Sequence, residues 1–172
     1  AILFPIMNDF PISKITARRF IMGKQGLWPG RRFSGVEGTA AALHQMDAVQ
    51  LDPLNVIARS QDIAMLGRVL DYRPEHLYQV AYEERGFFDY GGVLFLYPMS
   101  ELPYWRLHMK RAKDWKRLKA FREEHPETMK EVLAALRING PMGNKDFKGN
   151  KKLINSYRGG KDTSVALYSL WI

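Results

Sequence analysis

The chain has 172 residues, of which 46% are hydrophobic and 12% aromatic, and this composition excludes a wholly disordered protein. Its 26 Lys and Arg residues outnumber 18 Asp and Glu residues, which gives a formal net charge of +8. The absence of cysteine excludes disulfides and thiolate metal sites, and it permits a reducing compartment. No run approaches the roughly 20 apolar residues that span a bilayer. We therefore expect no membrane partner and a cytoplasmic setting, close to the nucleoid in a bacterium.

The first half of the chain is predicted to contain helices and a small sheet. Hydrophobic periodicity, capping residues and breakers predict four helices, at residues 13–25, 36–46, 57–70 and 75–84. Alternating apolar residues predict a strand at 48–52, and aromatic runs around Gly91-Gly92 predict a β-hairpin over 87–98. This order of elements is close to that of an elaborated winged-helix unit, with the hairpin as its wing.

The second half is predicted to be helical. Helices are expected at residues 100–124, at 128–139, from 144 onward and at 164–171. The first of them is one long, strongly basic helix, and His125-Pro126 after it is the clearest domain boundary. Asp162 or Thr163 is expected to cap the last helix, which would be the recognition helix of a helix-turn-helix scaffold.

The predicted fold class is therefore mainly α with a small β component, built from tandem winged-helix (helix-turn-helix) units, the second of them truncated. The expected divisions are a first winged-helix unit with its wing at 1–99, a basic connecting helix at 100–125 and the helical part of a second unit at 126–172. The wing strands that should follow are missing, and the chain stops at the apolar Leu170-Trp171-Ile172. This ending predicts an N-terminal piece of a longer protein.

The positive charge is concentrated in two segments. Residues 105–122 and 145–161 together contain 14 basic and 2 acidic residues, so they carry +12 and the remainder carries −4. Such a distribution is typical of a protein that binds a polyanion, and double-stranded DNA is the expected partner. A solvated helix face followed by a flexible loop is the alternative interpretation.

Two glycine-containing loops carry candidate phosphate ligands. Arg158 and Lys161 flank Gly159-Gly160, and Arg31 and Arg32 follow Pro29-Gly30. Backbone N–H groups and these cations are suited to DNA phosphates. The spacing is wrong for a nucleotide-binding Walker A loop. A simple turn and ordinary surface charge are the alternatives for the two loops.

Metal-dependent and nucleophilic catalysis find no support in the sequence. The four histidines are scattered without metal-ligand spacing, so no metal is expected. No Ser-His-Asp or Cys-His arrangement can be drawn. The simplest interpretation of the run Glu83-Glu84-Arg85 is a helix end whose Arg85 pairs with a carboxylate, and a catalytic Glu83 or Glu84 is the alternative.

The tripeptide Gln50-Leu51-Asp52, followed by Pro53, contains the candidate catalytic pair. Alternate side chains of a strand share a face, so Gln50 and Asp52 should project together while Leu51 points the other way. An amide beside a carboxylate at the end of a strand is able to hold one water, as hydrolysis requires. Two polar residues on a solvent-facing strand would look the same in sequence.

Several stretches resemble the YcaQ/AlkZ-like family of winged-helix DNA glycosylases, which act on alkylated bases and interstrand crosslinks. They are the segments 49–60, 82–85 with the aromatic run after it, 139–147 and 157–164. The resemblance runs from about residue 13 to the end, in the same order and at the same spacing. The family motif of Gln, an apolar residue, then Asp or Gln falls on Gln50, Leu51 and Asp52.

The resemblance implies a monofunctional DNA repair glycosylase that hydrolyses the N-glycosidic bond of N7- or N3-alkylated purines or of crosslinks. Asp52 would stabilise the oxocarbenium-like sugar and activate water, and Gln50 would hydrogen-bond that water. Arg59, within the same stretch, is a further candidate DNA-binding residue. No cofactor and no metal are required.

Departures from the family pattern leave alternatives open. Related sequences often have histidine after the Ala-Arg-Ser step, where this chain has Gln61-Asp62, and they are roughly twice as long. One alternative is a non-catalytic winged-helix DNA-binding module or regulator in which Gln50 and Asp52 are structural. Another is an interaction scaffold whose basic segment at 105–122 meets an acidic partner.

Overall fold

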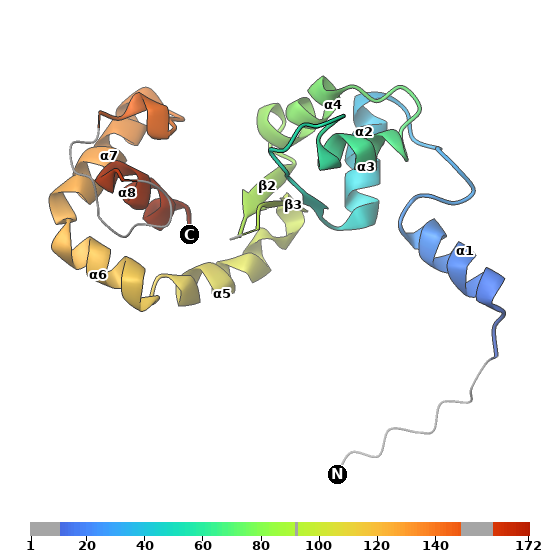
Figure 1. Ribbon diagram of the computed structural model, residues 1–172, viewed down its shortest axis with the longest axis horizontal. Helices are drawn as coiled ribbons and strands as arrows, with labels where there is room; N and C mark the ends of the chain where they lie inside the picture. Colours follow the sequence, from blue (N-terminus) through green and yellow to red (C-terminus); the bar gives the residue numbers. More distant parts are fainter. Residues whose placement is uncertain (1–10, 92, 149–159) are drawn as a thin grey trace, which may run out of the picture. The chain divides into compact units, whose positions relative to one another are not determined.

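The computed structural model describes residues 11–91, 93–148 and 160–172 (Figure 1). The chain divides into two compact units, Ala1–Met99 and Ser100–Ile172. The described parts are mainly helical and contain one three-stranded sheet, which confirms the expected mainly α composition with a small β component.

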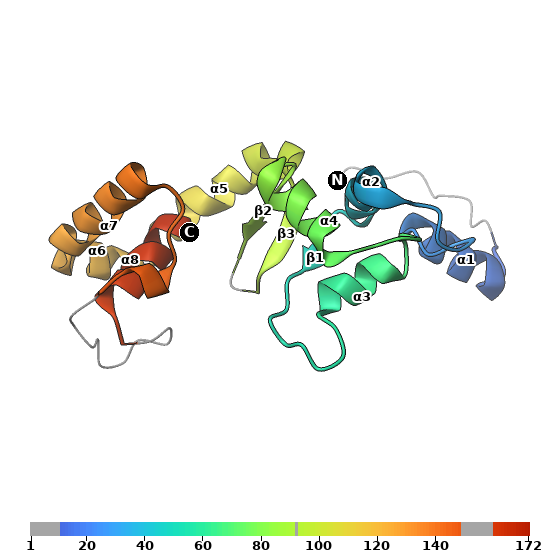
Figure 2. The same cartoon turned by 90° about the horizontal axis from the view of Figure 1, so that it is seen from above.

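The strands of the described residues all lie in the first unit. Its elements are α1 (Lys14–Lys24), α2 (Gly35–Met46), β1 (Val49–Gln50), α3 (Ser60–Leu66), α4 (Pro74–Tyr78), the π-helix η1 (Gln79–Glu83), β2 (Phe87–Tyr90) and β3 (Phe95–Pro98). The helix expected at 57–70 is shorter than predicted, because residues 51–59 form a loop that Figure 2 shows leading from β1 to α3. The helix expected at 75–84 is an α-helix only as far as Tyr78, because its second half is the π-helix η1.

The sheet is antiparallel with the strand order β1-β3-β2, and its β2–β3 pair confirms the predicted hairpin. Gly91, between these strands, has a φ of +105°, which only glycine adopts without strain. The strand predicted at 48–52 is only two residues long. It ends early because the Asp52 carboxylate turns back on its own chain, where Oδ1 accepts the Leu54 N–H at 2.9 Å.

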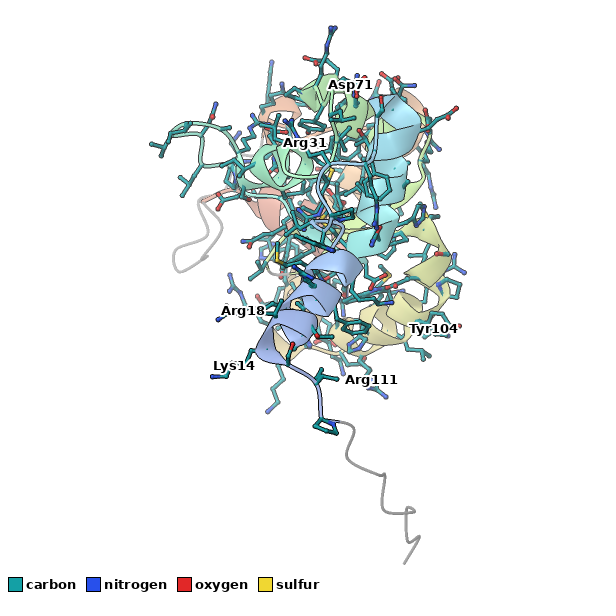
Figure 3. The ribbon with its side chains drawn as sticks, turned by 90° about the vertical axis from the view of Figure 1, so that its right-hand side faces the viewer. Lys14, Arg18, Arg31, Asp71, Tyr104 and Arg111 are labelled. Atoms are coloured by element: carbon teal, nitrogen blue, oxygen red, sulfur yellow. The ribbon has the colours of Figure 1, made fainter. Side chains whose placement is uncertain are left out.

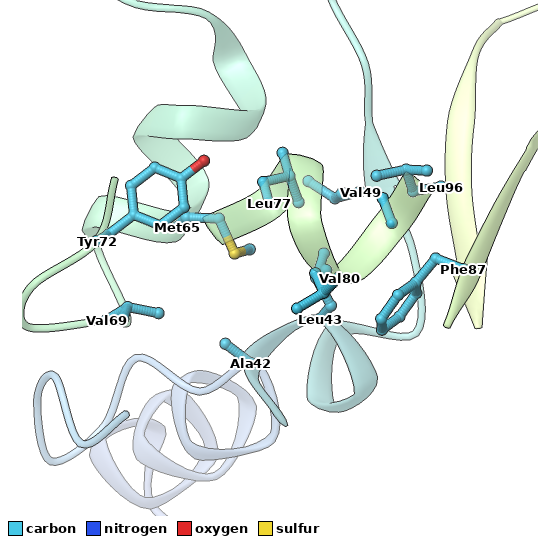
Figure 4. Packing of buried hydrophobic residues seen from close by; sticks show 11 residues of the cluster. Ala42, Leu43, Val49, Met65, Val69, Tyr72, Leu77, Val80, Phe87 and Leu96 are labelled. Carbon is cyan, nitrogen blue, oxygen red and sulfur yellow. The ribbon is translucent and has the colours of Figure 1, made fainter. Parts of the chain in front are cut away.

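The core of the first unit lies between α2, the α4–η1 segment and the sheet (Figure 4). Leu43 of α2, Val80 of η1 and Leu96 of β3 are almost completely buried there, and Met65 of α3 closes one side. Val49 belongs to the same cluster, so the inward face of β1 is anchored by hydrophobic packing. The outward face, with Gln50, stays exposed.

Helix α1 begins where the sequence predicts. The Ser13 side chain caps it by accepting the Thr16 N–H at 3.1 Å, and Gly26 follows its end with a φ of +73°. None of its residues is buried, and Figure 3 shows Lys14 and Arg18 projecting from it. A hydrogen bond attaches the C-terminal end of α1 to the segment after α3: Arg68 Nε donates to the Gln25 carbonyl at 2.7 Å.

The second unit contains η2 (Met99–Glu101, at the junction of the two units), α5 (Leu102–Ala112), α6 (Lys116–Glu124), α7 (Pro126–Asn139), η3 (Asn144–Asp146) and α8 (Asp162–Trp171). The single long helix predicted at 100–124 is wrong, because a turn at 113–115 separates α5 from α6. One continuous helix would place Ala112 and Leu118 about 120° apart around its axis. In the structure both side chains are buried, Ala112 at the end of α5 and Leu118 in α6.

Helices α6, α7 and α8 share a small core. Phe121, Val132, Val165 and Ala166 form its buried cluster. The helix predicted at 128–139 is confirmed, and the one predicted at 164–171 begins two residues earlier, at Asp162. Lys161 occupies its N-cap position, so the expectation of an Asp162 or Thr163 cap is wrong.

Helices within residues 11–91, 93–148 and 160–172 fall short of the length and apolarity needed to cross a membrane. Over the same ranges, the structure gathers no group of three or more His, Asp or Glu side chains suited to a metal ion.

Candidate active-site pocket

A solvent-open pocket of about 610 Å³ lies in the first unit, between β1, the loop after it, α3, the α4–η1 segment and β3. This volume is in the usual range for a small-molecule site. The lining residues are Gln50, Leu51, Asp52, Pro53, Arg59, Gln61, Asp62, Pro74, Leu77, Tyr78, Tyr82, Val93, Leu94 and Leu96. The structure therefore brings both members of the predicted catalytic pair to one pocket.

Hydrogen bonds hold both the backbone and the side chain of Asp52. Its backbone N–H donates to Oε1 of Gln61 at 3.0 Å, and its Oδ1 accepts the Leu54 N–H at 2.9 Å. The Gln61 side chain is itself fixed, because only 6% of that residue is exposed. Among the described residues the carboxylate oxygen Oδ2 has no hydrogen-bond partner, so it is available to a water or a substrate.

Gln50 is placed by the sheet. It pairs with Phe95 of β3, and Leu51 after it donates its N–H to the Leu94 carbonyl at 2.8 Å. Ser60 Oγ, at the first turn of α3, lies 3.5 Å from the Gln50 carbonyl oxygen. These contacts fix the backbone while the Gln50 side chain faces the solvent-open pocket.

A buried hydroxyl orients a second carboxylate in the lining. Tyr72 donates its hydroxyl to Oδ1 of Asp62 at 2.6 Å. Burial, together with this hydrogen bond and the negative charge of Asp62, raises the pKa of Tyr72 above its ordinary value. The phenol therefore stays protonated and remains a donor to Asp62. Sequence reasoning missed this pair, although it noted Gln61-Asp62 as a departure from the family pattern.

Two tyrosines form one wall of the pocket. Tyr78 at the end of α4 and Tyr82 in η1 have ring centroids 5.4 Å apart with planes inclined at 47°. Sequence analysis assigned neither of them to a site. The helical periodicity of residues 75–84 gives no sign of the π-helix, in which Tyr82 lies.

Arg59, Arg31 and Arg32 occupy different surroundings in the first unit. Arg59 is exposed and lines the pocket, so this candidate DNA ligand lies beside Gln50 and Asp52. Arg31 and Arg32 are exposed but do not line it. The guanidinium of Arg32 donates to Gln45 Oε1 at 2.6 Å and to the Trp28 carbonyl at 3.3 Å, so it already has partners within the fold.

Of the two candidate cations of the second unit, Lys161 is at the N-cap of α8. Lys161 donates its ammonium group to the Phe147 carbonyl at 3.1 Å, which ties the beginning of α8 to the segment after η3. Arg158 lies outside the described residues. The predicted DNA contacts of both residues stay predictions.

The pocket and the chain as a whole carry opposite charge. The lining contains two carboxylates, Asp52 and Asp62, and one guanidinium, Arg59, so its formal charge is −1 in a chain of +8. Such a lining disfavours a phosphate group and favours an uncharged or positively charged ligand.

The fold and the site together define a mainly helical protein with an open, weakly acidic pocket that is lined by an amide, Gln50, and a carboxylate, Asp52. Comparison with protein families identifies it further: the model of the DNA glycosylase AlkZ-like family matches residues 43–172, more than half of the chain. The chain belongs to this family, which confirms the resemblance seen in the sequence. Comparisons with curated proteins and with solved structures gave no match.

Family membership gives the chain a role in DNA repair as a glycosylase, a hydrolase that acts on DNA. The matched segment begins within α2 and includes every residue of the pocket lining.

Proposed function

We propose that this protein hydrolyses the N-glycosidic bond of N7- or N3-alkylated purines or of interstrand crosslinks, with Asp52 and Gln50 as its catalytic residues. The observation that carries the proposal is that both side chains line one pocket and that Gln61 fixes the backbone of Asp52. In a member of a DNA glycosylase family, a carboxylate held in this way is suited to a water-dependent cleavage.

The proposed reaction begins with a purine that already carries a positive charge from alkylation. The C1′–N bond breaks, and its electron pair neutralises the departing base, so little help from a general acid is required. The sugar becomes oxocarbenium-like, and the negative charge of Asp52 stabilises it. Water held by Gln50 and Asp52 adds to C1′ and passes a proton to Asp52, which later releases it to solvent.

The topology of the first unit supports a winged-helix assignment. A helix, a short strand, two helical segments and a hairpin follow one another from α2 to β3, and β1 pairs with the hairpin in the order β1-β3-β2. We extend the proposal to a tandem arrangement, in which α7, η3 and α8 belong to a second, similar unit. The recognition role of α8 is part of this proposal.

The basic segment at 105–122 supplies cations for a DNA backbone. Seven of its eight basic residues are exposed. Arg122 is the exception: its guanidinium donates to the Lys113 carbonyl and, at 3.1 Å, to Oγ of Ser169, so it stabilises the turn between α5 and α6. We propose that the exposed cations contact phosphates, which predicts that DNA affinity falls steeply with salt concentration.

The experiment compares the parent protein with Asp52→Asn and Gln50→Ala in single-turnover release of 7-methylguanine from alkylated duplex DNA. Loss of a general base should slow release by about 10²–10⁴-fold in Asp52→Asn. Asp47→Asn is the matched control, because Asp47 is an exposed carboxylate of the same unit that does not line the pocket. Its φ of +62° is one that asparagine tolerates.

Binding of the intact duplex is measured in parallel for each variant. Unchanged release by Asp52→Asn, with DNA affinity retained, would overturn the catalytic assignment. If the parent protein binds duplex DNA and releases no base, the non-catalytic DNA-binding module becomes the better description. Weak binding even at low salt would instead favour the interaction scaffold.

A further inference from the structure

The proposed hydrolytic step uses Gln50 and Asp52 and gives no role to the aromatic wall of the pocket, Tyr78 and Tyr82. Tyr78 and Tyr82 are 58% and 46% exposed, and both face the pocket that contains Asp52. Paired aromatic rings at a solvent-open pocket are unusual on a monomer surface unless a ligand covers them, because aromatic side chains contribute most when they are buried.

The two rings are held in place by their own segment of chain. Leu77, Val80 and Ala81 alternate with them along α4 and η1, and all three are buried in the core of the first unit. The π-helix contains the i→i+5 hydrogen bond from the Glu84 N–H to the Gln79 carbonyl, at 2.9 Å. Such turns often occur at functional sites, where they re-aim a side chain.

Each ring is a neutral π surface near a negative lining. Burial raises the pKa of Tyr82, and the nearby Asp89 adds to the shift, so its phenol stays uncharged. A neutral tyrosine ring attracts a cation over its face and stacks with a planar base. The carboxylates of Asp52 and Asp62 act in the same direction, since both favour positive charge in the pocket.

We propose that Tyr78 and Tyr82 form a recognition wall that stacks with the extruded base and selects bases carrying a positive charge over neutral bases of the same shape. The inference rests on the proposed function, because it assumes that an alkylated base enters this pocket. It assigns the two tyrosines as specificity-determining residues, separate from the pair that acts on water.

The test is a binding measurement that needs no catalysis. The protein is titrated with 7-methylguanosine, at mildly acidic pH where the base is cationic, and with 7-methyl-7-deazaguanosine, which has the same shape and no charge. Chemical shifts in NMR spectra report weak binding of both nucleosides. We expect the cationic nucleoside to bind roughly two- to thirtyfold more tightly.

Variants separate stacking from folding. Tyr82→Leu and Tyr78→Leu should each weaken binding of 7-methylguanosine roughly five- to a hundredfold, whereas Tyr82→Phe should keep most of the preference for the cation because its ring remains. Tyr104→Leu is the matched control, since Tyr104 is an exposed tyrosine of α5 in the second unit and does not line this pocket. Thermal unfolding of each variant confirms that it is folded.

The outcomes distinguish this inference from the proposed function. Equal affinity for the two nucleosides, or unchanged binding by folded Tyr82→Leu and Tyr78→Leu, would overturn the recognition wall even if Asp52→Asn abolishes base release. Conversely, selective binding that requires the tyrosines would stand even if Asp52→Asn releases 7-methylguanine at the parent rate. In that case the catalytic assignment alone fails.

Discussion

Gln61→Leu tests whether the amide of Gln61 positions Asp52. Leucine is close in size and apolar, so the change removes the acceptor of the Asp52 N–H, 3.0 Å away, without opening a large cavity. Leaving a part-buried N–H unsatisfied costs about 1 to 2 kcal/mol. The local opening of the Asp52 amide should therefore become roughly five to thirty times more frequent.

Amide hydrogen exchange measured by NMR reports this opening directly. We expect faster exchange at Asp52 in Gln61→Leu and unchanged exchange there in Gln79→Leu. Gln79 is a suitable control because its side chain makes an exposed bond, to Glu84 Oε1 at 2.9 Å, away from the pocket. Base release should also fall in Gln61→Leu while duplex affinity is kept. Unchanged exchange at Asp52 in a folded Gln61→Leu protein would refute the positioning role.

Two further predictions concern stability. The Gly35 N–H donates to Oδ1 of Asp71 at 2.6 Å and lowers the pKa of Asp71. This stabilisation is complete above the unfolded-state value of about 3.9 and is lost as pH falls through the lower folded-state pKa. Thermal unfolding against pH should therefore show a shallower acid decline in Asp71→Asn, and an identical decline would contradict this. Leu43 is 1% exposed, so Leu43→Ala should lower the free energy of unfolding of the first unit by about 2–5 kcal/mol, as measured by urea unfolding. A loss below about 1 kcal/mol would contradict the place of Leu43 in the core.

Local signals made part of this fold predictable. The Ser13 cap depends on residues three apart, and the hairpin depends on a glycine that accepts a positive φ between two aromatic runs. The alternation of Val49 and Gln50 between core and solvent follows from strand geometry. Gln50 and Asp52 do line one pocket, but Asp52 lies beyond the end of β1 and Leu51 lines the same pocket, so strand alternation does not explain their placement.

Other features depend on contacts that the local sequence does not encode. No glycine or proline occurs at 113–115, so the local sequence gives no signal for the turn between α5 and α6, where the Arg122 guanidinium donates to the Lys113 carbonyl. The bond between Gln61 and Asp52 exists only because α3 folds back beside the end of β1. The π-helix at Tyr82 is hidden for a similar reason, since a segment of five residues is too short to reveal its period.

The distribution of charge is consistent with two different tasks in one protein. A DNA backbone is polyanionic, and exposed cations such as those of 105–122 are suited to hold it. A pocket of the same sign would attract phosphates into the place where a base must enter. A lining of −1, with Asp52 and Asp62 against Arg59, instead favours an alkylated base, whose positive charge distinguishes it from its undamaged counterpart. We propose that Arg59, which lines this pocket, contacts a phosphate beside the extruded base. Arg59→Ala should therefore weaken duplex binding and, because the lining becomes more negative, keep or increase the preference for the cationic nucleoside.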